Sequence, residues 1–207
     1  MPSLTVRSIA EMLQLPAHAQ ARILREQKYP KQAPQVFRTP YYQPALTGIR
    51  RYFRAGNDKA ELAVAKTNIT LLSRESKREQ NSRVLDGFAK SALSKRKLLL
   101  QTNPGVRAQM GAVELRLGPD LRVLENGLEE FIFLNCRAQA LDSDVAIRTA
   151  EIAHWVLEQS GVKIPIGRIE YVDLFTGKSH ATTKRRAATT KALIQNFKII
   201  EALWPTL

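Results

Sequence analysis

The sequence predicts an α+β protein, with a helical N-terminal half followed by a small mixed sheet flanked by helices. Apolar residues recur at helical spacing up to about residue 110, whereas beyond Gly111 they alternate in short runs bounded by turn residues. We divide the chain into a basic helical region at residues 1–56, a long helical segment at 57–110 and an α/β core at 111–207.

Size and cysteine content set limits on the class of protein. With 207 residues, 44% of them hydrophobic, the chain can bury one core without disulfides or metal. Its single cysteine, Cys136, has no metal-ligand spacing to the three histidines, and no zinc site is expected. No run of about 18 apolar residues and no export signal is present, so we expect a cytoplasmic protein.

Positive charge is concentrated in the first half of the chain. Residues 1–110 contain 20 Lys/Arg and 7 Asp/Glu, whereas residues 111–207 contain 12 of each. Basic surfaces gain affinity for any nucleic acid by releasing counterions from the phosphates. We expect DNA or RNA as partner and no membrane. A generally basic protein and one that lies on anionic membranes are the alternatives.

The N-terminal segment predicts two short helices. Thr5 is a suitable N-cap for TVRSIAEMLQL, which ends at Pro16, and a second helix continues to Pro30. The pair fits either a plain helical hairpin or a helix-turn-helix that reads DNA. Three prolines in PKQAPQVFRTP then indicate an extended connection and a boundary.

The basic candidates come from three places in the chain. A helix predicted from Gln43 to Ala55 places arginines beside two aromatic residues, which suits phosphate contacts and stacking. One or two helices follow from Asp58 to about Leu100, with possible breaks near residues 67–73 or at Gly87. The candidate nucleic-acid-binding residues are Arg50, Arg51, Arg54, Lys95, Arg96, Lys97, Lys184, Arg185 and Arg186. An ordinary solvated helix face would look the same.

Beyond Gly111 the pattern predicts strands. AVELRL turns at GPD into LRVLEN as a hairpin, Asn126 and Gly127 form the next tight turn, and EEFIFLNCR resembles a buried central strand. SDVAIRTAEIAHWVLEQSG predicts an amphipathic helix with Ser143 as its N-cap. A strand in RIEYVDLF and a helix from Lys184 to Leu203 complete the chain, and the strand should pair beside the central one.

The order of elements, together with GPDLRVLENGLEEFIFLNCRAQ, resembles the PD-(D/E)XK, or restriction-endonuclease-like, superfamily over residues 75–200, and within it the RecB-like nucleases. In that family an acid at the start of one strand and an acid-X-lysine on the next gather a divalent metal at the sheet edge. The resemblance places Pro119 and Asp120 in the first position, and Asn135, Cys136 and Arg137 in the second.

This sequence departs from the family pattern at both ends of the second motif. Asn135 is neutral where an acid should bind the metal, and Arg137 cannot act as a base. The resemblance therefore implies degenerate catalytic positions at Asp120, Asn135 and Arg137. Glu114, or the acids at Asp142 and Asp144, would have to restore a metal site with Asp120. Asp173, before a Thr-Gly turn, is expected to cap that turn.

Three functions follow from these observations. The first is a nucleic-acid-binding protein with an inactive nuclease-like domain and no cofactor, acting with other protein subunits in a defence or mobile-element complex. The second is an active Mg²⁺-dependent nuclease with migrated ligands, Asp120 being joined by Glu114 or Glu79. The third is a helix-turn-helix regulator that uses residues 1–60.

Overall fold

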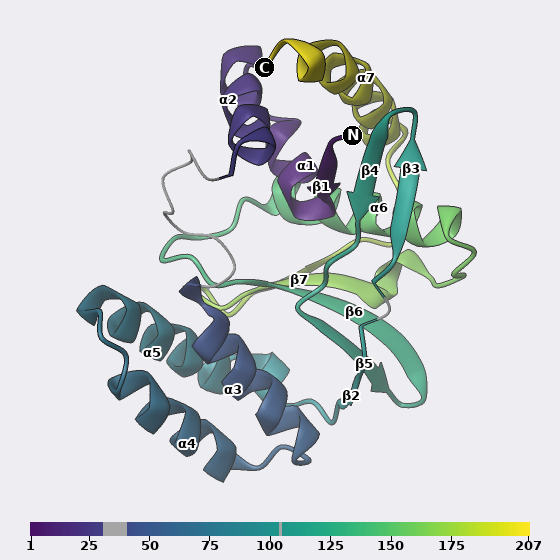
Figure 1. Cartoon of the computed structure of the whole chain (residues 1–207). Coiled ribbons are helices and arrows are strands. Elements are labelled where there is room, and N and C mark those ends of the chain that lie inside the picture. The colour runs from purple at the N-terminus through teal and green to yellow at the C-terminus, as the bar shows by residue number, and fades with distance from the viewer. Residues whose placement is uncertain (31–40, 104) are drawn as a thin grey trace.

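The computed structural model describes residues 1–30, 41–103 and 105–207, and the proline-rich connection expected at residues 31–40 lies outside this part. A five-stranded sheet lies at the centre (Figure 1). In spatial order its strands are β2 (Leu99–Gln101), β5 (Leu121–Glu125), β6 (Leu128–Asn135), β7 (Ile169–Asp173) and β8 (Ser179–Ala181). The predicted α+β class is confirmed.

The pairing of β6 with β7 is parallel, and the other neighbours in this sheet are antiparallel. Helix α6 (Ser143–Gln159) connects β6 to β7, as expected for a strand that returns to the same sheet. Asp142, one residue earlier than predicted, caps α6 by accepting a hydrogen bond from the Asp144 amide. The turn between β5 and β6 lies at Asn126 and Gly127, which both have positive φ.

A second, three-stranded sheet has the order β1 (Ser3–Thr5), β4 (Val113–Arg116), β3 (Arg107–Met110). The predicted hairpin between AVELRL and LRVLEN is therefore wrong, because β4 pairs with β1 and β3 and not with β5. The reason is burial. Val113 and Leu115 belong to one hydrophobic core, whereas Leu121 and Val123 belong to another on the far side of the central sheet.

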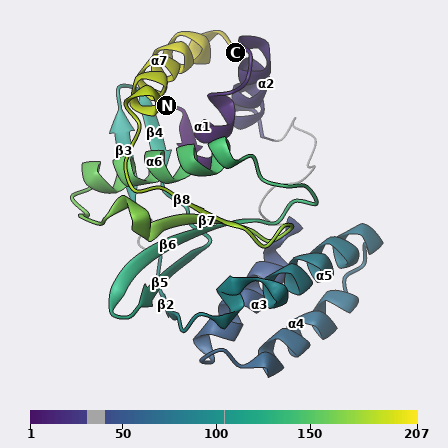
Figure 2. The same cartoon turned by 180° about the vertical axis from the view of Figure 1, so that it is seen from behind.

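Helices α3 (Gln43–Arg54), α4 (Lys59–Thr70) and α5 (Glu75–Lys90) pack together against one face of the central sheet (Figures 1 and 2). The Phe53 and Phe88 rings join α3 to α5, with their centroids 5.5 Å apart. The predicted 58–100 helical segment is thus two helices with a break at residues 71–74. A 3₁₀ turn, η2 (Ala92–Lys95), and the short strand β2 follow, and neither was predicted.

The other face of the central sheet is covered by α6, and beyond it lie α1 (Val6–Met12), α2 (Ala17–Lys28) and α7 (Ala187–Leu203) (Figure 2). Thr5 caps α1 as predicted, since its hydroxyl accepts a hydrogen bond from the Ser8 amide at 3.1 Å. The short turns η3 (Ile166–Arg168) and η4 (Trp204–Thr206) precede β7 and follow α7. Lys28 donates to the carbonyls of Trp204 and Leu207, which fastens the C-terminal residues to α2.

Alternate residues of β6 point into the two cores. Phe131 and Phe133 pack on the α6 side, whereas Ile132 and Leu134 pack on the α3–α5 side. Such a strand, buried on both faces, explains the continuous apolar run in its sequence. None of the helices in the described ranges has the length and hydropathy needed to cross a bilayer.

Candidate functional site

The structure brings the three predicted catalytic positions to one cavity. Asp120 precedes β5, and its carboxylate accepts a hydrogen bond from the Leu134 amide near the end of β6, at 2.7 Å. Asp120, Asn135 and Arg137 all line a cavity of about 430 Å³. This is the place at the sheet edge where the motif predicts the catalytic centre.

An arginine that the sequence analysis missed occupies this centre. Nη2 of Arg7, from α1, lies 2.5 Å from Oδ2 of Asp120, which is only 9% exposed. The guanidinium also lies over the rings of Phe133 and Tyr171, with its carbon 5.6 and 5.3 Å from their centroids. Burial alone would lower the pKa of Arg7, but the charge and hydrogen bond of Asp120, together with nearby Tyr171 and Cys136, outweigh it and raise that pKa. The negative charge of the Asp120 carboxylate is therefore neutralised by Arg7, a residue of the same chain.

Arg50 also forms hydrogen bonds within the protein. Its Nε and Nη2 atoms donate to the backbone carbonyl of Asp120 at 3.1 and 2.9 Å. This bidentate contact fixes the start of β5 against α3. We therefore assign Arg50 to positioning Asp120 and leave it out of the phosphate-binding set.

Asn135 and Asp173 hold the end of the sheet together. The Asn135 amide donates to Asp173 at 2.9 Å and to the Gln139 carbonyl, and its oxygen accepts from the Arg137 amide. Asp173 also accepts from the Thr176 hydroxyl and from the amides of Leu141 and Phe175. Although burial opposes it, these hydrogen bonds lower the pKa of Asp173. The prediction that Asp173 caps its turn is confirmed.

The remaining motif residues do not supply a nucleophile or a base. Arg137 is about half exposed, at 56%, and pairs with Glu11 at 2.9 Å. Burial raises the pKa of the Cys136 thiol to about 12, so the thiol stays protonated at neutral pH. An arginine keeps its proton at any physiological pH.

The residues around Asp120 do not fit a divalent metal. Mg²⁺ requires oxygen ligands in an octahedral arrangement, and here the two carboxylates that line the cavity are already paired, Asp120 with Arg7 and Glu11 with Arg137. Glu114, the proposed second ligand, lies in the three-stranded sheet and is engaged by Ser3 and Arg107, which lower its pKa. Throughout the described residues, no group of three or more His, Cys, Asp or Glu side chains is placed to hold a metal ion.

The other proposed replacement acids are also elsewhere. Asp142 caps α6, and Asp144 pairs with Arg148 and Arg186. Glu79 lies exposed on α5. The structure therefore does not bring any of these carboxylates to the cavity that holds Asp120.

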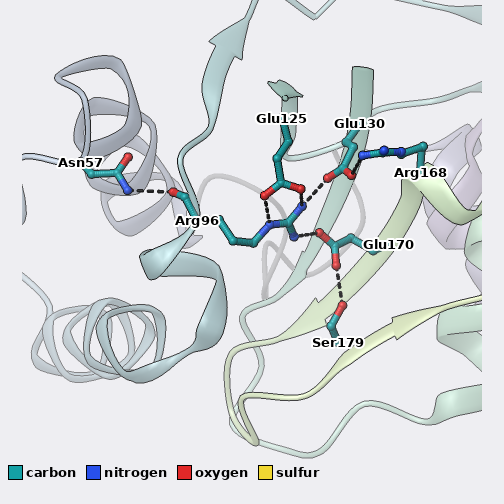
Figure 3. Close-up of polar contacts among 7 residues, drawn as sticks. All are labelled: Asn57, Arg96, Glu125, Glu130, Arg168, Glu170 and Ser179. Carbon is teal, nitrogen blue, oxygen red and sulfur yellow. Dashed lines mark hydrogen bonds and ion pairs between the residues drawn. The ribbon is translucent and has the colours of Figure 1, made fainter. Parts of the chain in front are cut away.

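Arg96 binds three carboxylates from three adjacent strands (Figure 3). Its guanidinium contacts Glu125 of β5 at 2.8 Å, and it also contacts Glu130 of β6 and Glu170 of β7. Arg168 adds a second cation to Glu130 at 2.6 Å. Hydrogen bonds from Arg96 lower the pKa of Glu125. Arg96 thus anchors the segment after α5 to the central sheet and is not free to bind phosphate.

Two more predicted arginines are engaged on the opposite side of the sheet. Arg185 pairs with Glu158 at 2.5 Å. Arg186 contacts the fully buried Glu151 at 2.9 Å and Asp144 at 2.8 Å. These contacts fasten the start of α7 to α6, and they leave only the neighbouring Lys184 exposed.

Four of the five remaining basic candidates lie on two segments that hydrogen bonds hold together. The Tyr52 hydroxyl donates to the Ser94 carbonyl at 2.6 Å. The Asn57 amide donates to the Arg96 carbonyl at 2.7 Å, as Figure 3 shows. These bonds hold the end of α3 beside η2. We call the exposed basic side chains of these two segments the α3–η2 basic surface, and they are Arg51, Arg54, Lys95 and Lys97.

The fold and this geometry define a class: an α+β protein whose sheet-edge carboxylate is neutralised by an internal arginine. No protein-family model, curated protein or solved structure matches the chain. The function is therefore argued from the site alone.

Proposed function

We propose that this protein binds DNA or RNA through the α3–η2 basic surface, and that its nuclease-like centre does not carry out metal-dependent cleavage. In this proposal, the resemblance to the PD-(D/E)XK superfamily is an interpretation of the sequence motif and of the order of elements. It is supported by the position of Asp120 before β5 and of Asn135 at the end of the adjacent β6.

The observation that carries the binding proposal is the joining of two basic segments that lie about 40 residues apart in sequence. Arg51 and Arg54 end α3, Lys95 and Lys97 flank the end of η2, and two hydrogen bonds hold these segments side by side. All four side chains are exposed, and none forms an ion pair with a residue that the structure describes. Exposed, unpaired cations on adjoining segments attract a polyanion.

The surrounding charge supports the same surface. Residues 41–98, which form α3, α4, α5 and η2, contain 13 Lys/Arg against 5 Asp/Glu. The opposite side, at α6 and α7, pairs Arg185 and Arg186 with acids. Nucleic acid is therefore attracted more strongly to the part formed by α3, α4, α5 and η2 than to the side formed by α6 and α7.

The catalytic part of the proposal depends on Arg7. A guanidinium bonded to Asp120 neutralises the only carboxylate that the motif retains at the cavity, and Asn135 is committed to Asp173 and the following loop. Metal catalysis needs an ion held by open, oriented ligands. The cavity instead presents fixed positive charge.

A matched pair of variants tests the binding surface. In the first, Arg51, Arg54, Lys95 and Lys97 are all replaced by Glu. In the control, four exposed lysines near the C-terminal side are replaced by Glu, which gives the same change in charge: Lys163, Lys178, Lys191 and Lys198. Fluorescence anisotropy with labelled duplex, single-stranded and hybrid oligonucleotides measures the affinities at several salt concentrations.

The first variant should bind at least tenfold more weakly, and the slope of its salt dependence should decrease by roughly one unit for each phosphate that it no longer binds. The control should stay close to the wild type. Equal decreases in the affinity of both variants would show that net charge alone drives association. Unchanged binding in the first variant would remove the α3–η2 basic surface from the proposal.

A further inference from the structure

The cavity beside Asp120 carries an excess of positive charge. Three arginines, Arg7, Arg116 and Arg137, line it, against two carboxylates, Glu11 and Asp120. Arg7 neutralises Asp120, and Arg137 pairs with Glu11. Arg116 is exposed and forms no ion pair within the described part of the chain. Its charge helps to lower the pKa of Glu114, but that carboxylate is bonded to Ser3 and Arg107, so the guanidinium of Arg116 keeps its donors out of any direct ion pair.

The same wall offers further hydrogen-bond donors. The hydroxyls of Thr5 and Ser8, which are hydrogen-bonded to each other at 2.9 Å and so have one proton left to donate, and the amide of Gln27 lie among the lining side chains. Arg137 is half exposed, so its guanidinium retains donors beyond those that contact Glu11. Tyr42 adds an aromatic ring at the start of α3, in edge contact with Tyr41. Cations, hydroxyls and an aromatic ring are the groups that bind a phosphate next to a base.

From this arrangement we infer that the cavity binds a phosphomonoester, and specifically the terminal phosphate of a nucleic-acid strand. The inference rests on the proposed nucleic-acid binding and names the part of the ligand that enters this cavity. A phosphomonoester has a second pKa near 6 and carries close to two negative charges at neutral pH, whereas an internal phosphodiester carries one. The larger charge and the extra free oxygen suit a wall with an unpaired arginine.

The size of the cavity favours a strand end over a duplex. A volume of about 430 Å³ lies toward the lower end of small-molecule sites, which span about 300–1,000 Å³. Such a space has the size of a small-molecule site and can accept a single nucleotide but not a base-paired duplex. The duplex or the rest of the strand must therefore lie outside.

Helix α3 connects the cavity to the basic surface. Tyr42 and Leu46, at its beginning, line the cavity, and Arg51 and Arg54 lie in its last turn. Twelve residues at about 1.5 Å each span roughly 18 Å, or about five phosphate spacings of a helical strand. A strand with its end in the cavity can thus follow α3 to the α3–η2 basic surface.

The test compares one oligonucleotide carrying a 5′-phosphate, a 3′-phosphate or only hydroxyl ends, with wild-type protein, Arg116→Ala and Arg22→Ala. Arg22 is an exposed arginine of α2 outside the cavity lining and controls for loss of one charge. We expect one phosphorylated end to bind about tenfold more tightly than the hydroxyl end. Arg116→Ala should abolish this preference, and Arg22→Ala should keep it.

Competition with a nucleoside monophosphate and with inorganic phosphate distinguishes the sources of the ligand. Loss of the end preference on adding the monophosphate supports the inference. Equal affinity of wild type for all three oligonucleotides overturns it, even if the monophosphate binds, because the occupant would then be a free nucleotide. The proposed function fails separately, if none of the oligonucleotides binds or if the quadruple Glu variant binds them normally.

Discussion

Arg7 and Asp120 are separated by 113 residues, yet the guanidinium of one lies 2.5 Å from the carboxylate of the other. This contact joins α1 to the first residue before β5 and lies where the motif predicts a metal. A positive charge is thus present at the sheet edge, but it belongs to the chain. The contact neutralises the carboxylate that a metal would need. It also contributes to the stability of the folded protein.

The first prediction concerns this pair. Arg7→Met leaves the Asp120 carboxylate unpaired at 9% exposure, and breaking one partner of such a pair costs about 3–5 kcal/mol. Asp120→Asn in the Arg7→Met background should recover part of the loss, because no charge is then left buried. Urea unfolding of the two single variants and the double variant measures this coupling.

The control for this cycle is the exposed pair of Lys66 and Asp86, whose side chains are each 49% exposed. Lys66→Met should change the free energy of unfolding by less than about 1 kcal/mol. A similar small effect of Arg7→Met would contradict the structural role that we assign to Arg7.

A second prediction concerns Arg96. Its replacement by Ala leaves Glu125, Glu130 and Glu170 close together without their shared cation. We expect a loss of roughly 3–5 kcal/mol in the free energy of unfolding. Arg96→Lys should recover only part of it, because an ammonium group cannot reproduce the planar contacts of a guanidinium. Full recovery by Lys would show that charge alone matters at this position.

A third prediction is a pH dependence. Hydrogen bonds lower the pKa of Asp173 in the folded protein, so its contribution to stability is complete above the unfolded value of about 3.9 and disappears as the pH falls through the lower folded value. Asp173→Asn should cost roughly 2 kcal/mol at pH 7. The difference from wild type should narrow as the pH falls below about 4.

Urea midpoints between pH 7 and pH 3 check this dependence, with the half-exposed Asp86→Asn as control. That control should change stability by less than about 1 kcal/mol at any of these pH values. A gap between Asp173→Asn and wild type that is constant with pH would contradict the assignment.

Local patterns predicted much of the fold. The alternation in β5 and β7, the continuous apolar run of β6, the turn at Asn126 and Gly127, and the N-cap Thr5 are properties of neighbouring residues, and they were predicted correctly. The strands β1, β2, β3 and β8 were missed because each has only three or four residues, too few for a periodic signal, and β3 lies in the segment predicted to be helical.

The candidate site was less predictable for a different reason. A sequence shows that Arg7 and Arg96 are basic, but not which acids the fold brings to them. Arg7 meets Asp120 only because α1 packs near the end of the central sheet, and Arg96 meets acids from three strands. Counting charges along the chain therefore overestimates the cations that remain free for phosphate.

The central claim is nucleic-acid binding without metal-dependent cleavage, and one assay tests it most directly. Labelled duplex, single-stranded and hybrid substrates are incubated with wild-type protein and with Asp120→Asn, in Mg²⁺, Mn²⁺ or EDTA, and both bound and cleaved fractions are measured. We predict that wild type binds equally well in EDTA and in either metal, without cleavage. Metal-dependent cleavage that disappears in Asp120→Asn would contradict the account and would mean that a metal displaces Arg7 from Asp120.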